Sequence, residues 1–204
     1  MGLLKVASRG PGPDHGPGAG LADKPTLGPD DRELIAQLAA GDPAAFEAIY
    51  RRHAGMVFGL LTRLIGPDRD REDLMQDVFV RLHAALARFR GECALTTLLY
   101  QITSRVAIDH LRRRTRNRFD LADFDLDDEI DPRASPADQT LRREQLATAV
   151  ELLASLSPEH RVVFILREVL ELPFDEIARI VGALPATTRM RVNAAKRALA
   201  RRQS

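Results

Sequence analysis

The chain has 204 residues, of which 45% are hydrophobic and only 5% aromatic, and its formal net charge is +1. A chain of this length forms one or two domains, and the scarcity of aromatic residues beside abundant Leu, Ala and Arg favours helices over sheets. No uncharged apolar run is long enough to cross a bilayer, and a single cysteine, Cys93, excludes an intramolecular disulfide framework and a cysteine-based zinc site.

The first 117 residues predict a tail followed by one helical domain. Residues 1–29 are rich in Gly and Pro and lack periodicity, which is typical of a disordered tail. The apolar stretch at their start is too short for a secretion signal. We therefore expect a cytoplasmic protein that does not insert into a membrane. Residues 30–117 then predict a compact domain of four helices, because apolar residues recur at helical spacing.

Capping residues set the predicted bounds of these helices. The first helix begins near Asp30, and Asp42 caps a second helix over residues 43–66. Asp70 is the predicted cap of the third helix, and the fourth spans residues 95–116. In the third helix, one apolar stripe consists of Leu74, Val78, Leu82 and Ala85.

The charge of the chain reverses at the end of the fourth helix. Arginines crowd positions 112–118, and aspartates follow at once. Residues 118–137 are acidic, end in Pro-containing turns and show no sustained apolar stripe, which predicts a flexible linker. From the residues alone, such a linker is either a solvated, extended tether or a segment that folds back on the preceding arginines.

Residues 138–204 predict a second helical domain. One helix is predicted over residues 137–156 and another over 157–170, capped by Ser157. Two shorter helices follow, joined by a tight turn at Gly182, which is typical of a helix-turn-helix. The predicted fold class is therefore all-α, with two small helical domains joined by the acidic linker.

The last helix predicts binding to duplex DNA. Its buried stripe is expected to consist of Val192, Ala195 and Leu199, while Arg189 and Asn193 fall mostly on the other side. The second helix of a helix-turn-helix lies in the major groove, where Arg pairs with guanine and Asn with adenine. A solvated basic face is the alternative interpretation, and the tight turn after a short helix favours DNA.

The third helix predicts a partner-binding surface rather than a catalytic one. Polar residues stand beside apolar ones along it, in the order Asp73, Met75, Gln76, Asp77 and Phe79. No His or nucleophile accompanies these carboxylates at a recognisable spacing, and the chain has no glycine-rich phosphate loop. We therefore expect no enzymatic activity, no cofactor, no metal and no small-molecule substrate.

Three stretches of the chain carry a family resemblance. They read DREDLMQDVFVRLHAAL from Asp70, FRGECALTTLLYQITSRVAIDHLRRR from Phe89 and LSPEHRVVFILREVLELPFDEIARIVG from Leu156. In order and spacing they resemble successive signatures of the ECF (extracytoplasmic-function) sigma factors, a branch of the sigma-70 family of bacterial RNA polymerase. The resemblance covers roughly residues 30–202, with the first domain similar to sigma region 2 and the last to region 4.

The resemblance implies an alternative sigma factor that binds core RNA polymerase, reads promoter DNA and helps to separate the strands near −10. Its partners would be the β′ clamp and β subunits of the polymerase, promoter DNA and an anti-sigma factor. The implied polymerase-binding residues are Asp73, Gln76, Asp77 and Phe79. The implied −10 residues are Arg90, Gly91, Glu92, Arg105, Asp109, His110, Arg112, Arg113 and Arg114. The implied −35 residues are Thr187, Arg189, Met190, Arg191, Asn193, Lys196 and Arg197.

The chain departs from the family pattern at several positions. Leu98 stands where relatives usually have Trp, and its apolar neighbours favour a core role over base stacking. Pro173 and Leu184 stand where small polar caps are common, which weakens capping by about 1 kcal/mol each. Met190 replaces a commoner residue, so the promoter preference of relatives does not carry over. Cys93 is interpreted as a small filler, since a redox role would require a lowered thiol pKa.

A stand-alone helix-turn-helix regulator is the alternative function. Such a protein would share the last helices, dimerise through its N-terminal helices and bind a palindromic operator in duplex DNA. It would leave the third helix and the acidic linker without a role.

Overall fold

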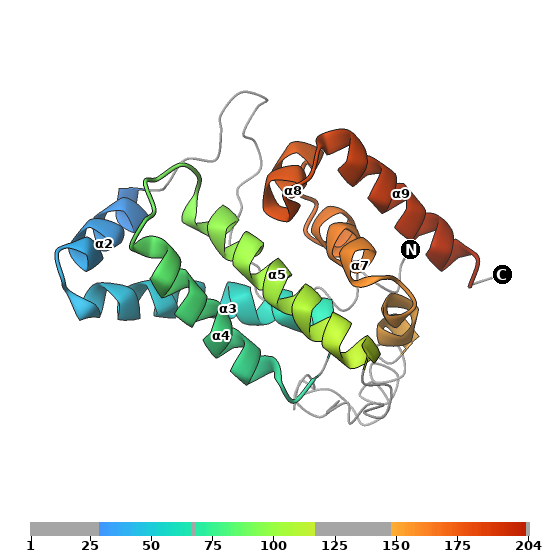
Figure 1. The fold of residues 1–204 in the computed structure, drawn as a ribbon, viewed down its shortest axis with the longest axis horizontal. Coiled ribbons are helices and arrows are strands. Elements are labelled where there is room, and N and C mark those ends of the chain that lie inside the picture. Colours follow the sequence, from blue (N-terminus) through green and yellow to red (C-terminus); the bar gives the residue numbers. More distant parts are fainter. Residues whose placement is uncertain (1–28, 67, 117–147, 203–204) are drawn as a thin grey trace, which may run out of the picture.

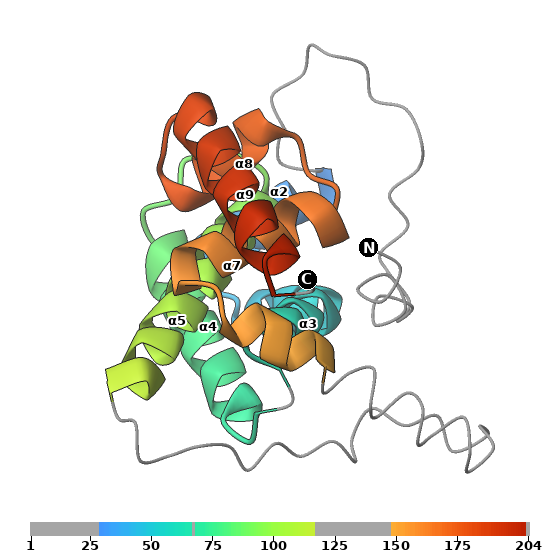
Figure 2. The same cartoon turned by 90° about the vertical axis from the view of Figure 1, so that its right-hand side faces the viewer.

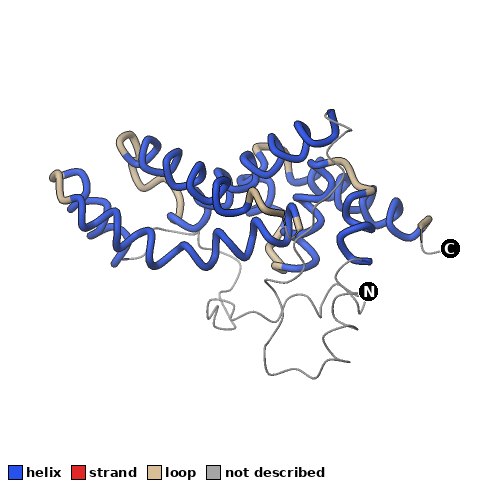
Figure 3. The backbone as a smooth tube through the Cα atoms, turned by 90° about the horizontal axis from the view of Figure 1, so that it is seen from below, coloured by secondary structure: helices blue, strands red, loops and turns tan. Residues whose placement is uncertain are grey.

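The computed structural model describes residues 29–66, 68–116 and 148–202. The regular elements in these ranges are helices joined by short loops (Figure 3), which confirms the all-α fold class. The predicted tail, the acidic linker and the first part of the helix predicted over 137–156 lie outside the described residues. None of the described helices is both long and apolar enough to span a membrane.

Four helices form the N-terminal half of the described chain. They are α2 (Pro29–Ala39), α3 (Pro43–Ile65), α4 (Arg71–Leu86) and α5 (Leu95–Arg116). The predicted cap of α3 is confirmed, because the Ala44 amide donates a hydrogen bond to Asp42 Oδ1 at 2.9 Å. Just before this cap Gly41 has a φ of 93°, a conformation that glycine adopts without steric cost.

The start of α4 differs from the prediction. Asp70 occupies the N-cap position, but its side chain makes no capping hydrogen bond. Instead the Asp70 amide donates to Asp68 Oδ1 at 3.0 Å, and Asp70 Oδ2 lies 3.7 Å from His110 Nδ1 on α5. Asp70 therefore stands at the predicted start of the helix, but its side chain does not cap it, because this carboxylate faces α5.

The apolar stripe of α4 lies at the centre of this half. Leu74, Val78 and Leu82 are at most 6% exposed, and α4 packs against both α3 and α5. On the far side, α2 packs against α3, and an ion pair of 3.1 Å joins Asp31 Oδ1 to Arg52 Nη1. The periodicity of α4 thus identifies its buried face correctly.

The C-terminal half contains a helical segment at residues 148–154 and four further elements. These are α7 (Pro158–Phe164), the π-helical turn η2 (Ile165–Val169), α8 (Phe174–Val181) and α9 (Pro185–Ala200). Ser157 caps α7 as predicted, its side chain accepting a hydrogen bond from the His160 amide. The helix predicted over 157–170 is not regular, because the Leu170 amide donates to Ile165 O, five residues back, at 3.1 Å.

The predicted helix-turn-helix is formed by α8 and α9. Gly182 ends α8 in the left-handed conformation, with φ 65° and ψ 42°. Neither Pro173 before α8 nor Leu184 before α9 provides a side-chain cap, as expected from these residue types. The stripe predicted in α9 is buried, and its members are Val192, Ala195 and Leu199.

The two halves pack against each other along α5. α8 and α7 both contact α5, and they lie beside it in Figure 1 and in the perpendicular view of Figure 2. Gln101 Nε2 of α5 donates to Arg179 O of α8 at 3.1 Å, and Arg112 Nε donates to Glu159 Oε1 of α7 at 3.0 Å. Buried apolar side chains of both halves belong to one continuous core.

Candidate nucleic-acid and partner interfaces

α9 presents an exposed face opposite its buried stripe. The exposed residues on this side are Arg189, Met190, Asn193 and Arg197. Arg189, Asn193 and Arg197 follow one another at intervals of four, so they share one side of the helix, and Met190 is 66% exposed. The guanidinium groups of the arginines, the amide of Asn193 and the apolar side chain of Met190 are the kinds of group by which proteins recognise base edges in the major groove.

Some side chains on the exposed face of α9 are held by contacts with other parts of the C-terminal half. Arg189 Cζ lies 5.1 Å from the centroid of the Phe174 ring. Lys196 Nζ lies 2.8 Å from Glu168 Oε1 on η2, so this amine already has a carboxylate partner. Thr187 and Arg191 are only partly exposed. The predicted −35 residues thus differ in how far they reach solvent.

α5 and the loop before it expose a second polar surface. Its helical members are Arg105, Asp109, Arg112, Arg113 and Arg116, and its loop members are Arg90, Gly91 and Glu92. The loop turns at Gly91, where φ is 75°. Most of the predicted −10 residues therefore lie at the surface.

An open groove of about 660 Å³ lies where α4, α5 and α7 meet. It is lined by Arg81, Asp109, Arg112, Arg113, Thr115, Arg116 and Pro158. Arg81 is held by Asp77 at 2.9 Å and faces Asp109 at 3.9 Å. Guanidinium groups outnumber carboxylates in this lining, so the groove suits phosphate oxygens.

α4 also exposes an acidic and apolar surface. Asp73 and Gln76 are exposed, and Val80 is 69% exposed. Phe79 is only 4% exposed and packs against Tyr50 with ring centroids 4.6 Å apart. The burial of Phe79 argues against its prediction as part of a docking surface, whereas the neighbouring Val80 is the exposed apolar residue of this helix. The sequence contained a signal for Val80, which lies seven residues after Asp73 and four after Gln76, so the three share one side of the helix.

Two family models match the chain in succession. They are sigma-70 region 2, over residues 49–117, and sigma-70 region 4, over residues 147–199. Together they cover more than half of the chain. The chain belongs to the sigma-70 family. The match to region 2 includes α4, α5 and all of α3 except its start. The match to region 4 includes α7, η2, α8 and all of α9 except its last residue.

Individual relatives point to the ECF branch of the sigma-70 family. The chain is 28% identical over 176 residues to RNA polymerase sigma-H factor of Pseudomonas aeruginosa, covering 83% of this chain and 91% of that protein. It is 27% identical over 176 residues to the ECF RNA polymerase sigma-E factor of Escherichia coli, covering 83% and 92%. A solved structure of CnrH in complex with the cytosolic domain of CnrY shares the fold, with a TM-score of 0.59, 24% identity and coverage of 84% and 95%.

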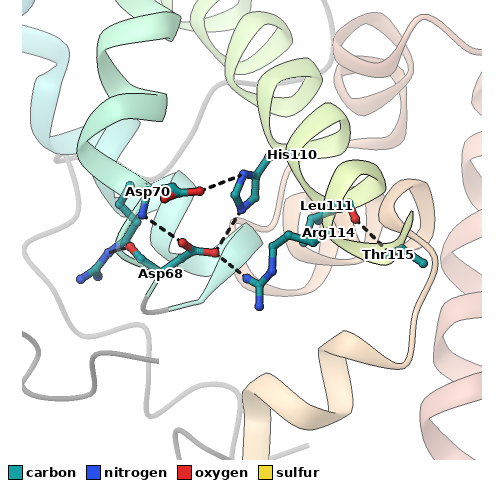
Figure 4. Close-up of polar contacts among 7 residues, drawn as sticks. Asp68, Asp70, His110, Leu111, Arg114 and Thr115 are labelled. Atoms are coloured by element: carbon teal, nitrogen blue, oxygen red, sulfur yellow. Dashed lines mark hydrogen bonds and ion pairs between the residues drawn. The ribbon is translucent and has the colours of Figure 1, made fainter. Parts of the chain in front are cut away.

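Inside region 2, a buried polar network ties the start of α4 to the end of α5 (Figure 4). His110 Nε2 lies 3.0 Å from Asp68 Oδ2, and Arg114 Nη1 lies 2.5 Å from the same oxygen. His110 is only 5% exposed. The burial of His110 argues against the prediction of this residue as a −10 contact. Arg114 binds Asp68 but its side chain is still 28% exposed, so its −10 contact stays a prediction.

The Asp68 network also resembles a metal site in outline. Ligand atoms of Asp68, Asp70 and His110 lie within 4.8 Å of one another. The guanidinium of Arg114, however, already supplies a cation to Asp68 Oδ2. Burial would raise the pKa of the Asp68 carboxyl, but hydrogen bonds from His110 and the Asp70 amide, with the charges of His110 and Arg114, lower it to about 2. We therefore interpret the cluster as an ion-pair network that fixes α4 on α5.

A buried cation lies on region 4, close to α5. Arg161 of α7 is 4% exposed, and its Nε and Nη2 atoms have no hydrogen-bond partner among the described residues. Burial, and then the charge of Arg114 on α5, lower its pKa to about 10. The residue type of Arg161 does not predict its burial, because arginine is mostly exposed in folded proteins.

The structure shows the surroundings of Leu98, which departs from the family pattern, and of Cys93. Leu98 is partly buried and packs against the core, in keeping with the core role expected for it. Burial raises the pKa of the Cys93 thiol, and the nearby Glu92 raises it further. Thiolate chemistry requires the opposite shift, which favours the interpretation of Cys93 as a small filler.

Proposed function

We propose that this sigma-70 family protein is an alternative sigma factor, which binds core RNA polymerase, directs it to promoters through −10 and −35 elements and helps to open the DNA for initiation. The observation that carries the proposal is the combination of surfaces on one chain. A helix-turn-helix with a basic face on α9 follows a helical module that exposes arginines on α5 and an acidic, apolar surface on α4. These modules occur in the order of the two family models.

At the −35 element, α9 would lie in the major groove of duplex DNA. Arg189 and Asn193 are exposed on the face that leads away from the core, and their side chains have the donors that recognise guanine and adenine. Met190 offers an apolar tip for a thymine methyl group. Arg197, one turn further on, is placed for a phosphate.

At the −10 element, α5 and the loop Arg90–Glu92 would receive the separated strand. Arg105, Arg112 and Arg113 are exposed on α5, and arginines bind phosphates without regard to sequence. The role is one of binding rather than covalent catalysis. We expect His110 to support this helix from within rather than to touch DNA.

The polymerase would dock on α4, and a further protein would regulate the factor. Asp73, Gln76 and Val80 form an exposed acidic and apolar surface, which suits a helical partner with basic and apolar groups. The similar fold of CnrH, solved in complex with the cytosolic domain of CnrY, supports an anti-sigma factor as the regulator. Both roles place the protein in the cytoplasm.

The test is reconstitution with core polymerase. The full chain, mixed with bacterial core RNA polymerase and genomic promoter fragments, should co-elute with the polymerase and start transcription at a small set of sites. A stand-alone helix-turn-helix regulator would instead bind duplex DNA tightly without polymerase, at sites with two-fold symmetry. A chain that neither co-elutes with core polymerase nor supports initiation contradicts the proposal.

A further inference from the structure

The ring of Phe174, the first residue of α8, lies against two arginines from different elements. Arg189 Cζ of α9 is 5.1 Å from the ring centroid, and Arg167 Cζ of η2 is 4.7 Å from it. Both distances are within the range at which a guanidinium is attracted to an aromatic face. One partly buried ring thus connects the π-helical turn with both helices of the helix-turn-helix.

Contacts with the apolar core and with Arg167 hold this ring in position. Phe174 packs against the apolar core, and Arg167 Nη1 donates a hydrogen bond to Leu172 O at 2.9 Å, two residues before Phe174. Arg189, by contrast, is exposed, and no other described residue is found to hold its guanidinium. A long exposed side chain of this kind has many rotamers, so contact with a fixed ring restricts where its guanidinium lies.

We propose that Phe174 is a positioning residue for base recognition: its ring holds Arg189 in the orientation from which the guanidinium reads a guanine edge in the −35 major groove. The inference rests on the proposed function. A bidentate pair of Arg with guanine requires the guanidinium in one plane, and a side chain ordered before binding loses less conformational freedom when it binds. Phe174 does not itself touch DNA.

The experiment selects binding sites from duplex DNA with a randomised segment, using the full chain bound to core polymerase. The probes are the wild-type protein and the variants Phe174→Leu, Phe174→Tyr, Arg189→Ala and Phe174→Leu with Arg189→Ala. Leu keeps an apolar side chain against the core but removes the π-face, whereas Tyr retains it. Thermal unfolding of each variant checks that the helix-turn-helix remains folded.

The expected result is selective. Arg189→Ala should erase the guanine preference at one position, and Phe174→Leu should weaken preference at that same position by about two- to fivefold, the size of an exposed cation–π contact. Phe174→Tyr should restore it, and the double variant should lose no more than Arg189→Ala alone. In NMR spectra, the Arg189 side-chain protons should shift upfield in the wild type and in Phe174→Tyr but not in Phe174→Leu.

Different failures have different meanings. An unchanged guanine preference in Phe174→Leu, or a loss spread equally over all positions, overturns the positioning role of Phe174 while leaving the proposed function intact. Additive losses in the double variant overturn it as well. A wild-type chain that binds polymerase but selects no sequence overturns the proposed function, and this inference with it.

Discussion

Asp68 joins the start of α4 to the end of α5 through one carboxylate, and its ionisation contributes to stability. Its pKa falls from 3.8 to about 2 in the folded chain. A carboxyl with a depressed pKa stabilises the fold fully above its unfolded pKa of 3.8 and loses this effect as the pH falls through about 2. The contribution at neutral pH is about 2 kcal/mol.

We therefore expect Asp68→Asn to lower the free energy of unfolding by about 2 kcal/mol at neutral pH, and by much less at about pH 2. Urea denaturation at several pH values measures the free energy of unfolding of the variant and of the wild type at neutral and at acidic pH. Asp70→Asn is the matched control: Asp70 is 62% exposed and 3.7 Å from His110, so its loss should cost less than about 1 kcal/mol. Equal losses in the two variants would contradict the central place of Asp68.

Arg161 presents the opposite situation, a buried charge without a counter-ion among the described residues. Two of its guanidinium nitrogens lack hydrogen-bond partners, and burial lowers its pKa. Replacing such a group by an apolar one of similar length removes the desolvation cost. Arg161→Met should raise the free energy of unfolding by about 1–2 kcal/mol. Arg167→Met, which removes the hydrogen bond to Leu172 O, should lower it, and thermal unfolding distinguishes the two signs.

These residues show which part of the candidate site could be predicted from the sequence. The residue types at His110 and Phe79 suit DNA or protein contacts, but both side chains are buried, because burial is decided by segments distant in the sequence. Asp68 lies 42 residues before His110, and Glu159 lies 47 residues after Arg112. Local periodicity contains no information on such pairs, whereas it does identify the exposed side of α9.

At the scale of elements, local signals predicted most helix bounds. The cap at Asp42, the break at Gly182 and the apolar repeats of α4 and α9 act within one or two turns of chain, so they can be read without tertiary knowledge. The π-helical turn η2 could not be predicted from such local signals. It is followed by Glu171 at a φ of 56° and by a hydrogen bond from the Leu172 amide to Leu166 O at 3.0 Å. Apolar periodicity alone does not distinguish η2 from an α-helix.

The helices α4 and α9 each expose one large apolar side chain, and the two should serve different partners. Val80 is 69% exposed on α4 and Met190 is 66% exposed on α9. Val80→Ser should weaken binding to core polymerase by about tenfold, the value of burying one Val side chain. Met190→Ser should leave polymerase binding unchanged and weaken binding to −35 duplex DNA.

Anisotropy titrations of a labelled full-length chain with core polymerase measure the first effect, and site selection by the assembled holoenzyme measures the second. Both substitutions shorten an exposed side chain, so neither should alter the melting temperature. If Val80→Ser binds core polymerase as well as the wild type, Val80 does not belong to the docking surface.

On the scale of the whole molecule, region 4 packs on α5 of region 2. The sequence predicts the apolar face of each helix but not which helix covers it, so the contact of α7 and α8 with α5 appears only in the structure. Within this contact Glu159 of α7 binds Arg112 of α5. The pair is partly exposed, at 57% for Arg112 and 32% for Glu159, so it contributes at most about 1 kcal/mol. We therefore expect that a DNA phosphate can replace the carboxylate of Glu159 as the partner of Arg112.

Glu159→Gln should release Arg112 and raise the affinity of the free chain for forked DNA by about two- to fivefold at low salt. The gain should shrink as the salt concentration rises, because exposed charges are screened. Glu151→Gln makes the same charge change at an exposed position of the helical segment 148–154 and serves as the control in the same fluorescence titrations. An equal gain from both variants would show a general effect of net charge and contradict a specific role of Glu159. A gain confined to Glu159→Gln means that region 4 competes with DNA for an arginine of region 2 until the two modules separate.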